Sequence, residues 1–117
     1  MTQPAVFDNI RVLEVTGVIG QWCGKLFGEM GADVIRVEPP GGSESRHVGP
    51  FLDDTPDPNR SLNFWQNNAN KKSLTLDLSS ATGAELFRTL AKDADVVIED
   101  QRPGALPGLG LGYDQLR

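Results

Sequence analysis

Two β-branched segments, separated by a helical repeat, constrain the fold of this chain more than any other feature of its sequence. Residues 10–15 alternate apolar with charged side chains, which is typical of a strand, and residues 33–38 predict a second strand that two prolines end. Between them, apolar residues recur every three or four positions from Trp22 to Met30, which predicts an amphipathic helix ended by Gly31. A strand–helix–strand unit of this kind forms a parallel sheet with a right-handed crossover, so the sequence predicts an α/β fold.

The second half of the chain repeats the same unit. Residues 73–78 alternate without a break and predict a third strand, while the continuous β-branched stretch 95–99 predicts a fourth, buried strand. Ser80 is a suitable N-cap for the helix between these strands, and residues 62–70 predict a short additional helix. The length suits a single core, so residues 1–117 are expected to be one region with no internal boundary.

The composition excludes several classes of protein. The chain has 11 Lys and Arg against 16 Asp and Glu, a net charge of −5, which disfavours a nucleic-acid surface. Its single cysteine, Cys23, excludes an internal disulfide and a cysteine-only metal site, and we expect no metal. The longest aliphatic run, Val96–Ile98, is far too short for a membrane span, and the N-terminus lacks an export signal. A cytoplasmic protein without membrane or nucleic-acid partners is therefore expected.

Residues 39–61 form a long segment that no core element explains. They hold five of the eight prolines and the only histidine, His47. Such a stretch is too long for a plain connector, so it predicts a functional or partner-contacting loop, with disorder as the alternative. We expect His47 to be exposed, and we expect Cys23, which lies on the apolar stripe of the first helix, to be a buried structural thiol. Neither residue therefore predicts a nucleophile or an acid–base group.

Three loops are candidates for binding an anionic ligand. The glycine-rich turn at residues 17–24 opens a helix, where free N–H groups and the helix dipole favour an anion, although a tight packing turn is an equally good reading. Its glycine spacing differs from that of a dinucleotide-binding oxidoreductase, the alternative that Glu38 at the next strand end would suit. Residues 67–73 offer two lysines to a phosphate, or form a solvated loop. Residues 99–104 follow a strand, where ligands of parallel sheets collect.

Several sequence strings, in order and spacing, resemble the N-terminal part of family III CoA-transferases. That family includes formyl-CoA and carnitine CoA-transferases and the α-methylacyl-CoA racemases. The resemblance covers the chain from about Val6 onward, which implies that it is the front piece of a longer protein. The strings that carry it are Ile10–Glu14, Gly31–Gly42, Asn70–Leu78, Asp93–Glu99, Arg102–Gly104 and Leu109–Tyr113.

The resemblance implies a Rossmann-like parallel sheet with flanking helices, as the N-terminal part of a large CoA-binding domain. It implies CoA transfer between an acyl-CoA and a carboxylic acid, in an interlocked homodimer of longer chains. The nucleophilic aspartate of the family lies beyond Arg117, so no catalytic residue is expected here. Carried over motif by motif, the CoA-binding residues are Thr16, Gly17, Val18, Ile19, Lys71, Lys72, Leu76, Asp100, Gln101 and Arg102.

Three departures from the family pattern keep other functions open. Gln21 stands near the usual A-G-P string, Asp100 and Gln101 replace an N-F pair, and Gly108 replaces a basic residue. A carboxylate at residue 100 accepts hydrogen bonds only and repels phosphate, so we expect it to weaken the hold on CoA. The alternatives are an α-methylacyl-CoA racemase-like enzyme and a non-catalytic half of a two-part CoA-transferase.

Overall fold

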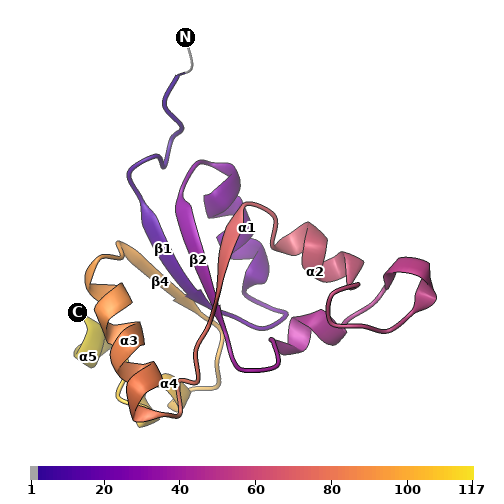
Figure 1. The fold of residues 1–117 in the computed structure, drawn as a ribbon. Helices are drawn as coiled ribbons and strands as arrows, with labels where there is room; N and C mark the ends of the chain where they lie inside the picture. The colour runs from indigo at the N-terminus through magenta and orange to yellow at the C-terminus, as the bar shows by residue number, and fades with distance from the viewer. Residues whose placement is uncertain (1–2) are drawn as a thin grey trace.

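The computed structural model describes residues 3–117, and its elements alternate as the sequence predicts (Figure 1). The strands lie within two residues of their predicted starts. The elements, in chain order, are β1 (Arg11–Val15), α1 (Gln21–Glu29), β2 (Asp33–Glu38), η1 (Glu44–His47), η2 (Leu52–Asp54), α2 (Leu62–Asn67), β3 (Lys71–Thr75), α3 (Ala81–Lys92), β4 (Val96–Glu99), α4 (Ala105–Gly108) and α5 (Tyr113–Leu116).

The strands form one sheet in the order β3-β2-β1-β4, and every paired neighbour is parallel. The α/β fold class is therefore confirmed. The chain proceeds outward from β1 through β2 to β3, and it then returns to place β4 on the other side of β1 (Figure 1). This reversal leaves a crevice between the carboxyl ends of β1 and β4, the position at which open parallel sheets bind ligands.

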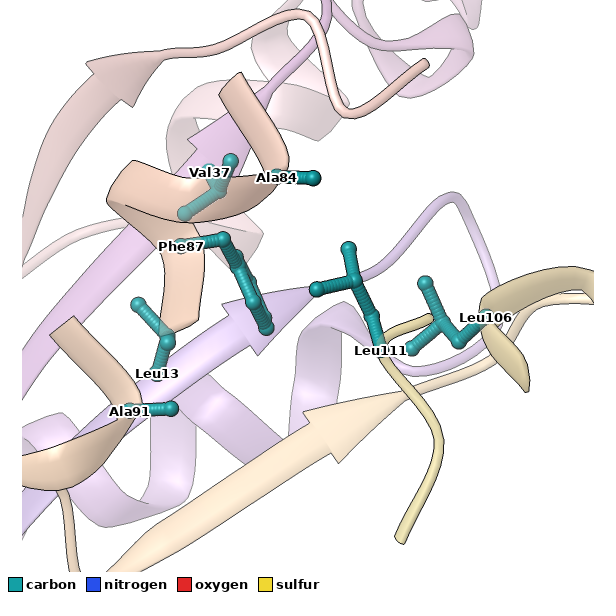
Figure 2. Packing of buried hydrophobic residues seen from close by; sticks show 7 residues of the cluster. All are labelled: Leu13, Val37, Ala84, Phe87, Ala91, Leu106 and Leu111. Carbon is teal, nitrogen blue, oxygen red and sulfur yellow. The ribbon is translucent and has the colours of Figure 1, made fainter. Parts of the chain in front are cut away.

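The main core lies on the α3 side of the sheet. Phe87 of α3 is fully buried and packs between Leu13 and Val37 of the sheet and the C-terminal Leu106 and Leu111 (Figure 2). The alternating leucines of residues 74–78 also pack against this cluster, which explains their period of two. This core anchors the segment after β4, whose loop forms part of the site described below.

Strand β3 is displaced from its predicted bounds of residues 73–78. The ladder with β2 begins at Lys71, opposite Val34, and ends at Thr75, opposite Glu38. One further bond joins the Leu76 N–H to the Glu38 carbonyl oxygen at 2.9 Å. Pro39, which follows β2, has no N–H to donate. The ladder therefore stops here, although the alternation of leucines continues to Leu78.

Helix α1 turns most of its predicted apolar stripe away from the sheet, although Phe27 packs against Val12 and Val34. Trp22, Leu26 and Met30 point outward and are 49%, 43% and 42% exposed. Cys23 is exposed, so the prediction of a buried thiol is wrong. The inward face is small instead, because a Cβ on Gly24 would lie 1.5 Å from Glu14 Oε1. The buried Glu14 side chain therefore leaves no room for a larger residue at position 24.

The long segment 39–61 contains η1 and η2, and its first part is bonded to β2 because the Ser43 N–H and Arg46 donate to Glu38. Ser43, Ser45 and Ser61 are buried, whereas His47 is exposed as predicted. Ser61 caps α2 by accepting from the Phe64 N–H, and the predicted Ser80 cap of α3 is confirmed by its bond from the Gly83 N–H. The serine side chains therefore replace an apolar core in this part of the molecule.

Two structural observations concern membranes and metals. Among residues 3–117, no helix has the length and apolar character needed to cross a bilayer. Within the same residues, no cluster of three or more His, Cys, Asp or Glu side chains is placed to hold a metal ion.

Candidate functional site

A hollow of about 670 Å³ opens at the carboxyl ends of the strands, beside the crevice between β1 and β4. Its volume lies in the range of small-molecule sites. Segments from four parts of the chain meet here, since parallel strands bring their carboxyl ends to one edge. The lining residues are Val15, Thr16, Gly17, Val37, Glu38, Pro39, Ser43, Glu44, Leu76, Asp77, Leu78, Ser79, Asp100, Gln101, Arg102, Ala105, Leu106 and Leu109.

The structure brings six of the ten expected CoA-binding residues to this pocket. They are Thr16 and Gly17 of the turn after β1, Leu76 just after β3, and Asp100, Gln101 and Arg102 after β4, whereas the candidate loop at residues 67–73 contributes no lining residue. Val18 and Ile19 continue the first of these loops outward and are 40% and 87% exposed. Lys71 and Lys72 are absent from the lining, because they begin β3 and lie toward the opposite end of the strand.

The two lysines pair with carboxylates on the two faces of the sheet. Lys71 Nζ lies 2.8 Å from Glu14 Oε1, and the lysine side chain is only 2% exposed. Burial lowers the pKa of Lys71 below its ordinary value of 10.5, although the bond to Glu14 acts in the opposite direction. Lys72 is 72% exposed and pairs with Asp33 at 2.7 Å on the other face of the sheet. The ammonium groups therefore point to opposite faces, which rules out a shared grip on one phosphate in this arrangement.

Asp100 holds the turn between β1 and α1. Its Oδ1 accepts from the Gly17 N–H at 2.8 Å, and its Oδ2 accepts from the Gly20 N–H at 2.7 Å. These are backbone donors of the glycine-rich turn that the sequence predicts as an anion seat. The anion that occupies them is a carboxylate of the protein itself, supplied by the strand end next to the turn.

A buried ionic cluster lies behind the same turn. Glu14 of β1 and Arg36 of β2 are 0% and 1% exposed and face each other across the sheet, with Arg36 Nη1 2.6 Å from Glu14 Oε2. Sequence reasoning missed this cluster. The signal in the sequence was one charged residue inside each of the two predicted strands. The parallel register pairs Glu14 with Arg36 on the face of the sheet that α1 covers.

Glu38 ends β2 at the rim of the pocket and is almost fully buried. Burial by itself would raise its pKa, but the Arg46 side chain and the Ser43 N–H donate to its carboxylate and hold the pKa below the ordinary value of 4.5. Arg46 Nε donates to Oε2 and Nη2 donates to Oε1, both at 2.7 Å. Both carboxylate oxygens thus accept hydrogen bonds, so Glu38 holds the loop of Ser43 and Arg46 at the side of the pocket.

The charge of the pocket lining is mainly acidic. Among the lining residues, Glu38, Glu44, Asp77 and Asp100 are acidic, whereas Arg102 is basic. Arg102 is exposed beside apolar surface from Leu76, Leu78, Leu106 and Leu109. A ligand with one anionic end and an apolar or amide body suits this combination better than a ligand that is charged throughout.

A second hollow, of about 850 Å³, runs along the outer edge of β4 between α3 and the C-terminal segment. Its lining includes Val96, Val97, Leu111 and Tyr113. The outer edge of β4 has no paired strand within residues 3–117. An unpaired strand edge with apolar walls is suited to pairing with another polypeptide segment rather than to binding a small ligand.

Fold and pocket together define an open parallel α/β protein with a pocket at the strand-order reversal. Residues 7–117 match the model of CoA-transferase family III. The chain belongs to that family.

Relatives with this fold and sequence are CoA-transferases. The chain is 44% identical over 110 residues to the succinyl-CoA:(R)-benzylsuccinate CoA-transferase subunit BbsE of Thauera aromatica, covering 94% of this chain and 27% of that protein. It is 40% identical to the succinyl-CoA:mesaconate CoA-transferase of Haloarcula hispanica, covering 94% of this chain and 28% of the relative. The chain thus spans little more than a quarter of the length of these curated relatives.

Solved structures agree with this assignment. The crystal structure of the hypothetical protein Rv3272 of Mycobacterium tuberculosis matches with a TM-score of 0.85 and 38% identity, over 99% of this chain and 31% of that one. A CAIB/BAIF family protein of Brucella suis matches with a TM-score of 0.86 and 38% identity, over 97% of this chain and 30% of that one. The expected resemblance to family III CoA-transferases is confirmed.

Proposed function

We propose that residues 1–117 are the N-terminal CoA-binding region of a CoA-transferase that moves CoA between an acyl-CoA and a carboxylic acid. The observation that carries the proposal is the pocket at the strand-order reversal, where the turn after β1, Leu76 and the Asp100–Arg102 segment meet. Membership of the family supports CoA transfer as the chemistry. We further propose that the full-length protein acts in the cytoplasm as an interlocked homodimer.

Arg102 is the residue that we assign to the CoA phosphates. It is the one basic group among the residues lining the pocket, and a guanidinium binds phosphate through a planar fork of donors. The apolar surface of Leu76 and Leu109 suits the pantetheine arm, and the exposed Val18 and Ile19 lie where the turn leaves the pocket.

The lysine pair keeps a different proposed role in the free protein. Lys71 donates to Glu14, to the Gln21 carbonyl oxygen at 2.8 Å and to Asn68 Oδ1 at 3.0 Å, so its three protons already have acceptors. Lys71 therefore positions β1, α1 and α2. Direct CoA contact by Lys71 or Lys72 stays a prediction. Lys72→Ala tests the contact of Lys72, because this exposed side chain can be truncated without opening the core.

The covalent chemistry is proposed to reside outside this chain. An aspartate of the remaining polypeptide attacks the thioester carbonyl carbon, forming an acyl anhydride and releasing CoA thiolate. Attack of the thiolate on the aspartyl carbonyl carbon of the anhydride then gives the enzyme–CoA thioester and releases the first carboxylate. The acceptor carboxylate attacks this thioester to form a second anhydride, and the released thiolate attacks its acyl carbon, which gives the new acyl-CoA and frees the aspartate. Splitting the transfer into such steps is the usual advantage of a covalent nucleophile.

A non-catalytic half of a two-part CoA-transferase is the second candidate. It is favoured by Asp100, whose carboxylate accepts from the backbone N–H groups of the turn after β1, and by the similarity to a protein named as a subunit.

A racemase-like enzyme differs in the fate of the acyl group and would show proton exchange at its α-carbon without CoA transfer.

Calorimetry on the full-length protein tests the proposed function. We expect CoA to bind, NADH not to bind, and Arg102→Gln to weaken CoA binding about tenfold, as loss of a charge-assisted bond predicts. Arg88→Gln is a matched control, because Arg88 is partly exposed and pairs with Glu85 on α3 outside the pocket lining. Absence of CoA binding, or equal losses in both variants, would contradict the assignment.

A further inference from the structure

The buried Arg36 guanidinium, which the proposed function does not use, connects two loops that wall the pocket. Its Nη1 donates to Glu14 Oε2 at 2.6 Å and to Thr16 Oγ1 at 2.7 Å. Its Nη2 donates to the Thr16 carbonyl oxygen at 2.8 Å and to the hydroxyls of Ser43 and Ser45 at 3.0 Å each. Thr16 and Ser43 both line the pocket, so one side chain spans the turn after β1 and the loop after β2.

Stability does not require an arginine in this place. Taking a charged pair out of water is so unfavourable that apolar residues of similar volume often stabilise a protein equally well. What an apolar side chain cannot supply is a rigid fork of donors. A lysine cannot supply it either, because its ammonium group is compact and reaches fewer separated acceptors. The geometry of Arg36 thus serves the placement of the loops it bridges.

The cluster around Arg36 prevents the guanidinium from turning away. Lys71 Nζ donates to the same Glu14 Oε2 at 3.0 Å and lies 2.8 Å from Oε1, so a second buried cation holds the carboxylate. The Thr16 hydroxyl donates back to Glu14 Oε2 at 2.9 Å, which closes a ring of three side chains. The ring of Phe64 lies 5.4 Å from the Arg36 guanidinium carbon and covers it. The two loops are therefore held to a rigid buried support.

We propose that Arg36 is a positioning residue of the CoA site. It holds the Thr16 backbone and Ser43 at a fixed separation, and it thereby keeps the pocket open in the form that the ligand occupies. Arg36 acts through these residues and does not itself line the pocket. This inference rests on the proposed function and assigns that site its internal support.

Two substitutions in the full-length protein test this role. Arg36→Lys keeps the charge but cannot span both loops, and Ser45→Ala removes one fully buried acceptor that does not line the pocket. We expect the CoA dissociation constant and the KM for acyl-CoA to rise about tenfold for Arg36→Lys and about threefold for Ser45→Ala, with kcat at saturation changed less than about twofold. Amide hydrogen exchange at residues 16–20 should become faster in both variants. Arg11→Lys is the control, since Arg11 pairs with Asp33 at the other end of β1, and it should change neither quantity.

The outcomes separate this inference from the proposed function. Folded variants with lower melting temperatures but unchanged CoA affinity and unchanged exchange at residues 16–20 would overturn the positioning role. If Arg36→Lys fails to fold, Ser45→Ala decides by the same measurements. If the wild-type protein binds no CoA, the proposed function fails, and amide exchange alone then decides whether Arg36 positions the turn.

Discussion

Asp100 is a structural anion at the residue scale. The family pattern has an amide at this position, and the sequence alone suggests that a carboxylate weakens CoA binding. The structure adds a function for the charge, because its two oxygens accept from the Gly17 and Gly20 N–H groups. An asparagine offers one accepting oxygen and would turn an NH₂ group toward the other N–H.

Asp100→Asn is therefore expected to loosen the first turn. The loss of a charge-assisted bond and the new donor–donor contact should lower the free energy of unfolding by about 1–3 kcal/mol. Urea unfolding of the full-length protein measures this, and amide exchange at Gly17 and Gly20 locates it. The CoA affinity of Asp100→Asn is a separate measurement. Removal of the negative charge is expected to tighten CoA binding, whereas loosening of the turn acts against it. Unchanged stability and exchange would show that the two bonds do not hold the turn.

Glu38 gives the fold an acid-sensitive contact. Its carboxyl has a folded-state pKa below the ordinary value of 4.5, so ionised Glu38 contributes stability above that pH. This contribution should decrease as the pH falls below 4.5 through the folded-state pKa, because the unfolded state then binds the proton more readily. Urea unfolding at a series of pH values should show a flatter acid limb for Glu38→Gln than for the wild type. Superimposable acid limbs would assign the acid sensitivity to other carboxylates.

Helix α1 shows at the element scale how a polar core selects the inward face of a helix. Gly20, Gly24 and Gly28 stand four residues apart and face the strands, and added Cβ atoms would come within 3.1 Å of other residues in each case. Of the large apolar residues, Trp22, Leu26 and Met30 are on the outer face, and Phe27 packs inward. Helical periodicity alone does not distinguish the two faces when a helix carries both a small stripe and an apolar stripe.

Gly24→Ala is expected to be strongly destabilising. The added methyl group would meet the Glu14 carboxylate, which Arg36 and Lys71 hold in place, so the helix must move away from the sheet. Overpacking of this kind lowers the free energy of unfolding by about 1–3 kcal/mol. Gly108→Ala is the matched control, because no atom lies within 4 Å of its added Cβ. Equal melting temperatures for the two variants would show that α1 adjusts freely above Glu14.

The whole molecule leaves apolar surface open on two sides. The outer face of α1 exposes Trp22, Leu26 and Met30, and the free edge of β4 lies beside the second hollow. The relatives are between three and four times longer than this chain, since it covers 27% and 28% of two of them. Their remaining length is ample to cover both surfaces.

Residues 1–117 alone should therefore associate at high concentration. Sedimentation equilibrium should show species larger than the 12.7 kDa chain, and Leu26→Gln with Met30→Gln should reduce them without lowering the melting temperature. A monomer at every concentration tested would contradict the expectation.

The same piece should also be inactive in CoA transfer, because the proposed nucleophile lies outside it. Incubation with acyl-CoA and an acceptor acid, followed by hydroxylamine or borohydride trapping, should yield neither turnover nor an adduct. An adduct on any residue of this chain would identify a nucleophile within it and reject the proposed division of roles.

Local sequence determined much of this protein. The β-branched residues of segment 33–38, the Ser80 cap and the glycine at position 31 are short-range features, and each predicted its strand or helix end correctly. The φ of Gly31 is 101°, which favours glycine. The ordered family strings indicated the parallel sheet and placed three loops at ligand-binding positions. Six of the ten residues expected to bind CoA line the pocket, and their contact with CoA stays a prediction.

Tertiary structure decided which polar groups are buried together and which helix face turns inward. Lys71 was expected at a phosphate, yet its partner Glu14 lies 57 residues away in the sequence and becomes adjacent only through the strand register. Cys23 and Trp22 face outward because Glu14 and Arg36 occupy the space under α1, and Asp100 meets the first turn because β4 returns beside β1. Periodicity and caps depend on neighbouring residues, whereas charge pairing in a parallel sheet depends on strands that the sequence separates. That difference in range is the physical reason why the elements were predictable and the buried cluster was not.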